Sequence, residues 1–185
     1  MSRASLLAEL ATYQPRDARE RTMTDDLIAF VSAHPECFER SLAVGHVTAS
    51  AWVTDPTGAA ALLTHHRKLG RWLQLGGHAD GDADVRRVAL REAVEESGVT
   101  AIRFASPSIY DVDIHRIPAR PGEPEHWHYD VRFAFFAARN APLSVSAESH
   151  ELRWIPLDRL DAFAVDESVR RLARKTPDLL VTNCP

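Results

Sequence analysis

Three glutamates lie close together near the end of the stretch from 73 to 99, LQLGGHADGDADVRRVALREAVEESGV. A helix turns by about 100° per residue, so Glu92, Glu95 and Glu96 would lie on one side of it. Like charges this close repel one another, and Arg91 can offset only one of them. Hard divalent cations such as Mg²⁺ and Mn²⁺ prefer carboxylate oxygens and keep water molecules that a phosphate group can replace. The spacing therefore favours a metal site that handles phosphate.

A solvated surface helix is the alternative interpretation, because glutamates and arginines commonly face water together. Two observations favour the metal site. Ala89, Ala93 and Val85 or Val88 supply an apolar face for the same helix, so the acidic side is not simply its remainder. Gly76 and Gly77, just before the helix, allow the backbone to approach such a site closely.

The stretch resembles the signature of the Nudix hydrolases. That signature has a Gly, an Arg-Glu pair fourteen residues later, an aliphatic residue, a Glu-Glu pair and a final Gly with an aliphatic residue. The matching positions here are Gly77, Arg91, Glu92, Ala93, Glu95, Glu96, Gly98 and Val99. One position departs: the family usually has a Glu six residues after the first Gly, and here Ala83 stands between Asp82 and Asp84.

This resemblance implies that Glu92, Glu95 and Glu96 hold Mg²⁺ or Mn²⁺, helped by the main-chain carbonyl of Gly76. Arg91 would orient the glutamates by ion pairing. The implied reaction is an attack of water on the pyrophosphate of a nucleoside diphosphate linked to another moiety. The implied fold, over about residues 42–160, is an α/β/α sandwich with a mixed sheet, in the α/β (α+β) class.

A general base must take a proton from the attacking water. Family members draw it from a signature glutamate or from a loop before a late strand. Residues 146–154, SAESHELRW, followed by Leu157-Asp158, are similar to that late segment. Glu148 and Glu151 are both candidates, and we favour Glu151 narrowly. The alternative is that this segment is a plain polar loop.

Histidines alternate with aromatic residues in the segment HWHYD. On a strand, His126, His128 and Asp130 would share one face, where they could contact metal or phosphate or form the wet side of a sheet. His78 follows the two glycines, and Arg71 is a nearby cation. We therefore predict that substrate is bound by Arg71, His78, His126 and His128. The aromatic residues Trp72, Trp127, Tyr129 and Phe133 could stack on a base, but core packing is the expected role for most of them.

Helices and strands must position these residues. Helical spacing and start signals predict helices over 2–13, 17–33, 83–97 and 166–175. A hairpin with a turn at 55–58 begins near Leu42, and further strands are expected at 69–75, 101–105, 108–115, 127–138 and 152–155. Gly76-Gly77 is expected to break the strand before it, and RIPARPGEPE to be a loop. We thus expect residues 1–40 to be a helical extension of a hydrolase domain at 41–185, in one folded unit.

Composition limits the class of protein. The chain has 185 residues, 45% of them hydrophobic, enough for one domain with a sizeable core. Its net charge of −4, without a basic block, argues against a nucleic-acid or membrane partner. The resemblance implies a small phosphate-containing substrate, and a homodimer is left open. Cys37 and Cys184 are far apart, and no leader or long apolar run is seen. These features predict a reduced, cytoplasmic protein.

Two other functions compete with hydrolysis. Isopentenyl-diphosphate isomerases are similar in fold and use His and Glu ligands, but they require a catalytic cysteine within the sheet region, where this chain has none. A binding or regulatory module would keep the fold without turnover. Ala83 favours that alternative mildly, whereas the complete Arg91-Glu92 and Glu95-Glu96 pairs oppose it.

Overall fold

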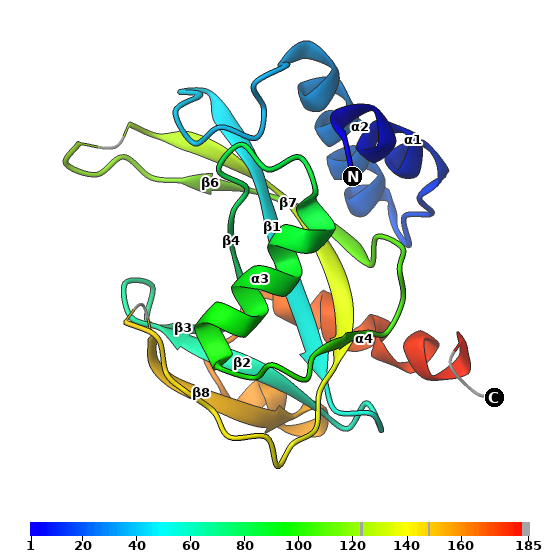
Figure 1. Cartoon of the computed structure of the whole chain (residues 1–185), viewed down its shortest axis with the longest axis vertical. Helices are drawn as coiled ribbons and strands as arrows, with labels where there is room; N and C mark the ends of the chain where they lie inside the picture. Colours follow the sequence, from blue (N-terminus) through cyan, green and yellow to red (C-terminus); the bar gives the residue numbers. More distant parts are fainter. Residues whose placement is uncertain (123, 148, 183–185) are drawn as a thin grey trace.

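The computed structural model describes residues 1–122, 124–147 and 149–182, and within them eight strands join in one mixed sheet (Figure 1). Strand β1 (Gly45–Thr54) is central: it runs parallel to β7 and antiparallel to β2 and β4. Strands β3 and β8 pair with β2, and strands β5 and β6 pair with β7. The other strands are β2 (Ala60–His66), β3 (Arg71–Leu73), β4 (Leu75–His78), β5 (Arg103–Phe104), β6 (Asp111–Ile117), β7 (His126–Phe136) and β8 (Ser149–Pro156).

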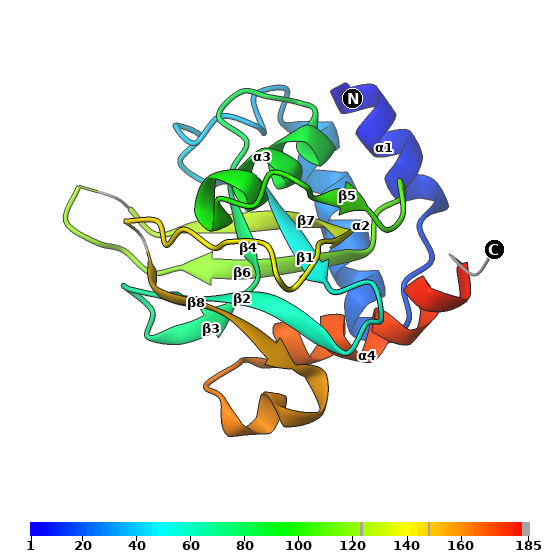
Figure 2. The same cartoon turned by 60° about the horizontal axis from the view of Figure 1, so that its bottom comes forward.

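Helices cover both faces of the sheet, with α3 on one side and α4 on the other (Figure 2). Because β1 and β7 are buried between these layers, alternate residues enter two apolar clusters, as Val53 and Trp52 do on β1. No helix in the described part of the chain has the length and hydropathy that a membrane span requires. The helices are α1 (Arg3–Thr12), α2 (Ala18–Ala33), α3 (Val85–Ser97), the 3₁₀ helix η1 (Leu157–Ala162) and α4 (Glu167–Thr182).

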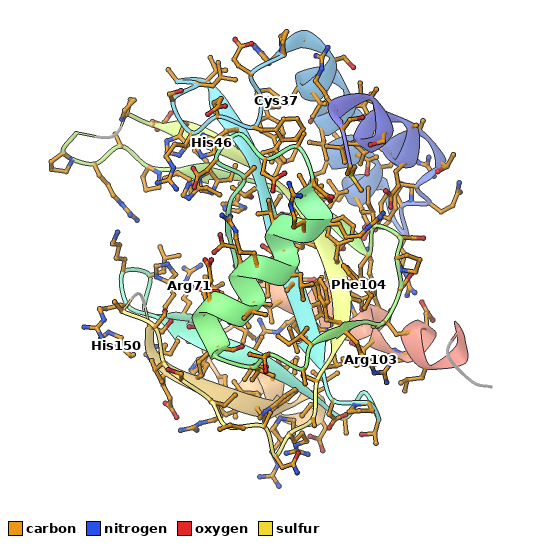
Figure 3. The ribbon with its side chains drawn as sticks, in the orientation of Figure 1. Cys37, His46, Arg71, Arg103, Phe104 and His150 are labelled. Carbon is orange, nitrogen blue, oxygen red and sulfur yellow. The ribbon has the colours of Figure 1, made fainter. Side chains whose placement is uncertain are left out.

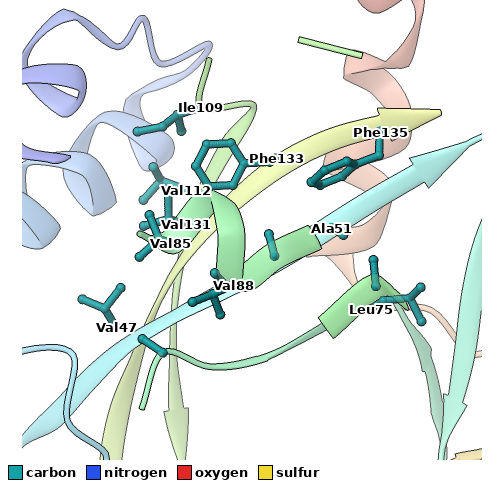
Figure 4. Packing of buried hydrophobic residues seen from close by; sticks show 14 of the residues in the cluster. Val47, Ala51, Leu75, Val85, Val88, Ile109, Val112, Val131, Phe133 and Phe135 are labelled. Carbon is teal, nitrogen blue, oxygen red and sulfur yellow. The ribbon is translucent and has the colours of Figure 1, made fainter. Parts of the chain in front are cut away.

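Helix α3 carries the three glutamates. It begins where the side chain of Asp84 accepts a hydrogen bond from the Arg87 N–H, and it ends at Gly98, whose φ of 72° suits a left-handed C-cap. Its apolar residues Val85 and Val88 pack against side chains of β1 and β7 in the larger cluster (Figure 4). This packing fixes the helix across the sheet, beside β4.

Helices α1 and α2 pack against the same layer of the molecule. Leu6 and Leu10 of α1 and Leu27 and Val31 of α2 are buried in the apolar cluster that also contains Val47 of β1. The helical extension predicted at the N-terminus is therefore present and shares the core of the sheet.

Most of the predicted elements are confirmed, and the differences include the following. Gly76 and Gly77 lie within β4 instead of breaking a strand, because they pair with Ser50 and Ala49 of β1. A Cβ at Gly76 would lie 2.4 Å from Ser50 Oγ, so the close pairing needs glycine there. The strand expected at 101–105 is shortened to β5. Helix α4 runs beyond residue 175, since Leu179 continues its buried stripe.

Candidate active site

The three glutamates of α3 have different surroundings. Glu96 is 8% exposed and accepts a hydrogen bond of 2.9 Å from the N–H of Gly76. Glu92 is packed against Gly77, where an added Cβ would lie 2.5 Å from its Oε2. Glu95 is exposed, and no hydrogen bond or ion pair is found for it within the described residues. Two carboxylates are thus held against β4, and the third faces solvent.

Arg91 connects the helix to the end of β4. Its Nη2 group donates to Glu92 Oε1 at 2.8 Å and to the carbonyl oxygen of His78 at 3.0 Å. These two contacts fix the carboxylate of Glu92 relative to the strand. The orienting role of Arg91 stays a prediction.

Glu96 lies on the buried stripe of α3, in line with Ala89 and Ala93, and not on a face opposite to them. The sequence predicted one acidic side and one apolar side. The difference arises because the buried side of the last helical turn meets the backbone of β4. Gly76 has no side chain to fill that space, and its N–H stabilises a carboxylate there.

Three aspartates that precede the helix have structural partners. Asp80 accepts two hydrogen bonds from Arg40, and Asp82 accepts two from Arg87, which lowers the pKa of each carboxyl below its usual range. Asp84 caps α3. This region therefore shapes the loop and the start of the helix. Ala83, the departure from the signature, packs at the edge of the larger apolar cluster.

The structure does not bring Glu151 together with these glutamates. On β8, Leu152 and Trp154 pack toward the apolar cluster that includes α3. Glu151 alternates with them, lies opposite His65 of β2 on the other face and pairs with Arg153 at 2.5 Å. The other candidate for the base, Glu148, lies outside the described residues.

Five histidines form a cluster where β6, β7, β1 and β4 lie side by side. His46 is its centre: its ring centroid is 5.0 Å from that of His78, 5.0 Å from His126 and 4.8 Å from His128. His115 packs on His128 at 5.4 Å. The predicted substrate-binding histidines His78, His126 and His128 are thus brought together, around a residue that was not predicted.

His46 was not predicted, because it is an isolated histidine in the sequence, one residue after Gly45. The available signal was its alternation with Thr48 and Ser50 on a strand otherwise rich in apolar residues. Burial, together with the neighbouring imidazoles, lowers the pKa of His46 to about 4 and that of His128 to about 2. Both rings are consequently neutral near neutral pH.

Asp130 lies on the same face of β7 as His126 and His128, but it contacts a different set of residues. It accepts hydrogen bonds from the Ser50 hydroxyl at 2.8 Å and from Arg132 Nε at 2.7 Å. Arg132 also pairs with Asp111 and Asp113, which in turn bind residues of α4. We call this set the buried ion network: Glu20, Asp111, Asp113, Asp130, Arg132, Arg171 and Lys175.

Arg71 is exposed on the edge strand β3, and in the view of Figure 3 it lies between His46 and His150. Core packing is confirmed for Trp72 and Phe133, which are buried. The ring of Tyr129 stacks on that of Phe30, with 3.9 Å between the ring centroids. Trp127, by contrast, is 44% exposed and is not part of the core.

Cys37 bears on the isomerase alternative. It is fully buried, and burial raises the pKa of its thiol to about 11. The thiolate, which is the nucleophilic form, is therefore scarce at neutral pH. Cys184 lies outside the described residues.

A model of the NUDIX domain family matches residues 44–176, which is well over half of the chain. The chain belongs to the NUDIX family. With the signature residues in place on α3, this NUDIX protein is a hydrolase that acts on pyrophosphate bonds. No curated protein matches its sequence.

Solved structures share the fold of this NUDIX protein. A NUDIX-family hydrolase from Clostridium perfringens has a TM-score of 0.57 at 24% identity, over 73% of this chain and 97% of that one. The C. elegans Ap4A hydrolase, in a binary complex, has a TM-score of 0.59 at 18% identity, over 74% and 98%. A MutT NUDIX hydrolase from Burkholderia pseudomallei has a TM-score of 0.51 at 25% identity, over 71% and 97%.

Proposed function

We propose that this protein hydrolyses a pyrophosphate bond in a small substrate, a nucleoside diphosphate linked to another moiety, with Mg²⁺ or Mn²⁺. The observation that carries the proposal is the arrangement on α3, where Glu92 and Glu96 are held against Gly77 and Gly76 and Glu95 is exposed beside them. A surface helix without a site would not need two carboxylates packed against glycines of the neighbouring strand β4.

The donor groups fit a hard divalent cation. Glu92, Glu95 and Glu96 offer carboxylate oxygens only, and Mg²⁺ is commonly held by one or two carboxylates while it keeps several waters. The carbonyl of Gly76 remains a proposed fourth donor. When bound, the ion would polarise the phosphate oxygens and lower the pKa of a coordinated water.

Side chains and backbone groups of the protein would orient the metal-binding carboxylates and supply the general base. Arg91 holds Glu92, and the N–H of Gly76 holds Glu96, so these carboxylates are preorganised before substrate arrives. We assign the general base to Glu95, because it is exposed and carries no partner within the described residues. Glu151, the earlier candidate, is engaged by Arg153 on the other face of β8.

The two candidate bases can be separated by matched substitutions. We expect Glu95→Gln to lower kcat by at least about 100-fold, and Glu151→Gln to leave kcat within a few-fold of the wild type. Steady-state kinetics with the best substrate and saturating metal measure both. If Glu151→Gln lowers kcat strongly while Glu95→Gln stays active, Glu151 on β8 is the general base and not Glu95.

Contacts to the substrate remain proposals. Arg71 is an exposed cation for a phosphate group, and His78 lies directly beside the glutamate site through its carbonyl contact with Arg91. His126 and His128 belong to the histidine cluster, so they would contact a substrate only if part of the substrate lay against that cluster. We also propose that residues 1–40 and 41–185 fold as one cytoplasmic unit, with a homodimer as one assembly to test.

A substrate panel tests the function. Nucleoside triphosphates, ADP-ribose, dinucleoside polyphosphates and coenzyme forms are incubated with the protein and Mg²⁺ or Mn²⁺, and the products are separated by chromatography. We expect metal-dependent cleavage of a pyrophosphate bond in at least one class. If none is cleaved and one compound raises the melting temperature, the protein is a binding module.

A further inference from the structure

We propose that His46, His78 and His128 bind a transition-metal ion of the zinc class, at a site separate from the glutamates of α3. Each of these residues offers one ring nitrogen, and the three nitrogens lie within 4.8 Å of one another. They come from three neighbouring strands, β1, β4 and β7. His46 lies opposite His128 in the parallel pair, and His78 lies opposite Thr48 on the other side of β1.

His46 is the strongest indication of a missing ligand. It is 3% exposed, and neither of its ring nitrogens has a hydrogen-bond partner within the described residues. A buried polar group left unsatisfied destabilises the fold, so such groups in folded proteins usually have an ion or water beside them. Three imidazoles around one point make a metal ion the ligand that satisfies His46 best.

The donor chemistry selects the type of ion. Imidazole nitrogens suit zinc and other late first-row ions, whereas Mg²⁺ and Ca²⁺ prefer oxygen. Zinc–nitrogen bonds of about 2.0–2.1 Å place tetrahedral ligand atoms roughly 3.4 Å apart. The cluster would reach this spacing through small ring rotations. Three protein ligands leave a fourth position for water or an anion.

A second layer of contacts supports one of the ligands. The Nδ1 group of His126 lies 2.9 Å from the carbonyl oxygen of Pro124, which can only accept, and its Nε2 lies 3.2 Å from His128 Nε2. In one tautomeric arrangement, the Nδ1 group of His126 donates to the carbonyl oxygen of Pro124, and its Nε2 accepts from His128 Nε2. The Nδ1 lone pair of His128 is then available to a metal. Histidine ligands commonly have their second nitrogen fixed in this way.

The proposed site is adjacent to the hydrolytic site but does not share its ligands. The carbonyl oxygen of His78 binds Arg91, which holds Glu92, while the ring of His78 packs on His46 and His128. A bound ion would tie β4, β1 and β7 together. It would also fix the strand end that carries Gly76 and Gly77.

The test is direct metal binding by protein prepared without a histidine tag and stripped with chelator. Zinc binding is measured by calorimetry, and Co²⁺ is used as an absorbing probe of ligand geometry. We expect one tight zinc site per chain and a melting temperature that rises with zinc. His46→Asn and His128→Asn, made separately, should each weaken zinc binding by at least about 100-fold and remove that rise.

Two controls make the result specific. His150→Asn changes an exposed histidine outside the cluster and should bind zinc as the wild type does. A Glu92→Gln, Glu95→Gln, Glu96→Gln triple variant should also keep the zinc site, even though it loses turnover. Wild-type zinc affinity in folded His128→Asn and His46→Asn, or zinc binding lost only in the triple variant, would overturn the proposal.

Discussion

Glu96→Gln is expected to lower kcat by at least about 100-fold while the protein stays folded. The side chain is nearly buried, and its Oε2 accepts a hydrogen bond from the N–H of Gly76. Glutamine has almost the same shape and keeps an oxygen that can accept that bond, so α3 should remain seated on β4. What is lost is a negative charge at the position proposed to hold a divalent cation.

The measurement is kcat against metal concentration, together with circular dichroism and Tm. If the charge holds the ion, the variant should also require more Mg²⁺ for half-maximal activity. Glu167→Gln is a matched control, because Glu167 is an exposed glutamate in the first turn of α4 that pairs with Arg174. A kcat within a few-fold of the wild type in folded Glu96→Gln would refute the metal assignment.

Arg132→Met is expected to lower the free energy of unfolding by about 3–5 kcal/mol. Arg132 is 1% exposed and pairs with Asp130 at 2.7 Å, Asp113 at 3.2 Å and Asp111 at 3.3 Å. Methionine replaces its volume but not its charge. Three buried carboxylates would then lose a shared cation, and Asp130 would keep only hydroxyl donors.

The pH dependence gives this prediction a second readout. Burial alone would raise the pKa of Asp113, but the charge of Arg132 and contacts with His115 and Arg171 hold it well below the ordinary value of 3.8. A lowered carboxyl pKa contributes stability above the unfolded value, and this contribution is lost as the pH falls through the folded one. Without the charge of Arg132, burial would raise the carboxyl pKa in the variant, and the carboxyl could then be protonated in acid. The deficit of Arg132→Met should therefore be largest at about pH 7 and smaller at about pH 4.

Urea unfolding at both pH values measures the deficit. Arg174→Met removes an exposed arginine of α4 and should change the stability by no more than about 0.5 kcal/mol. Equal deficits for the two variants, or a deficit for Arg132→Met that does not shrink in acid, would show that the buried ion network is not held by charge.

Much of this structure could be predicted from local patterns in the sequence. The spacing of Glu92, Glu95 and Glu96 was enough to predict the acidic helix, because a helix relates residues within a few positions of one another. The turn at Asp55 was predictable for the same reason: its side chain accepts hydrogen bonds from the N–H groups of Thr57 and Ala59. The α/β/α arrangement followed from the order of such elements and from the resemblance.

Features that depend on strand pairing were not predictable. Alternation showed that His126, His128 and Asp130 share a face, but it could not show that His46 lies opposite His128. The side of β8 on which Glu151 lies depends on which face meets α3, and one residue of shift reverses it. The position of Glu96 on the buried side of α3 depends likewise on the backbone of β4, which no helical pattern contains.

The parallel pairing of β1 with β7 also has a consequence for how the protein forms. Thr48 and Asp130, which meet across this pair, are 82 positions apart in the chain. Contacts between such distant positions slow folding, because a large loop must close before they stabilise anything. While the chain emerges from the ribosome, α3 and the β1–β2 hairpin can form early. The histidine cluster and the buried ion network must wait until β7 has been synthesised.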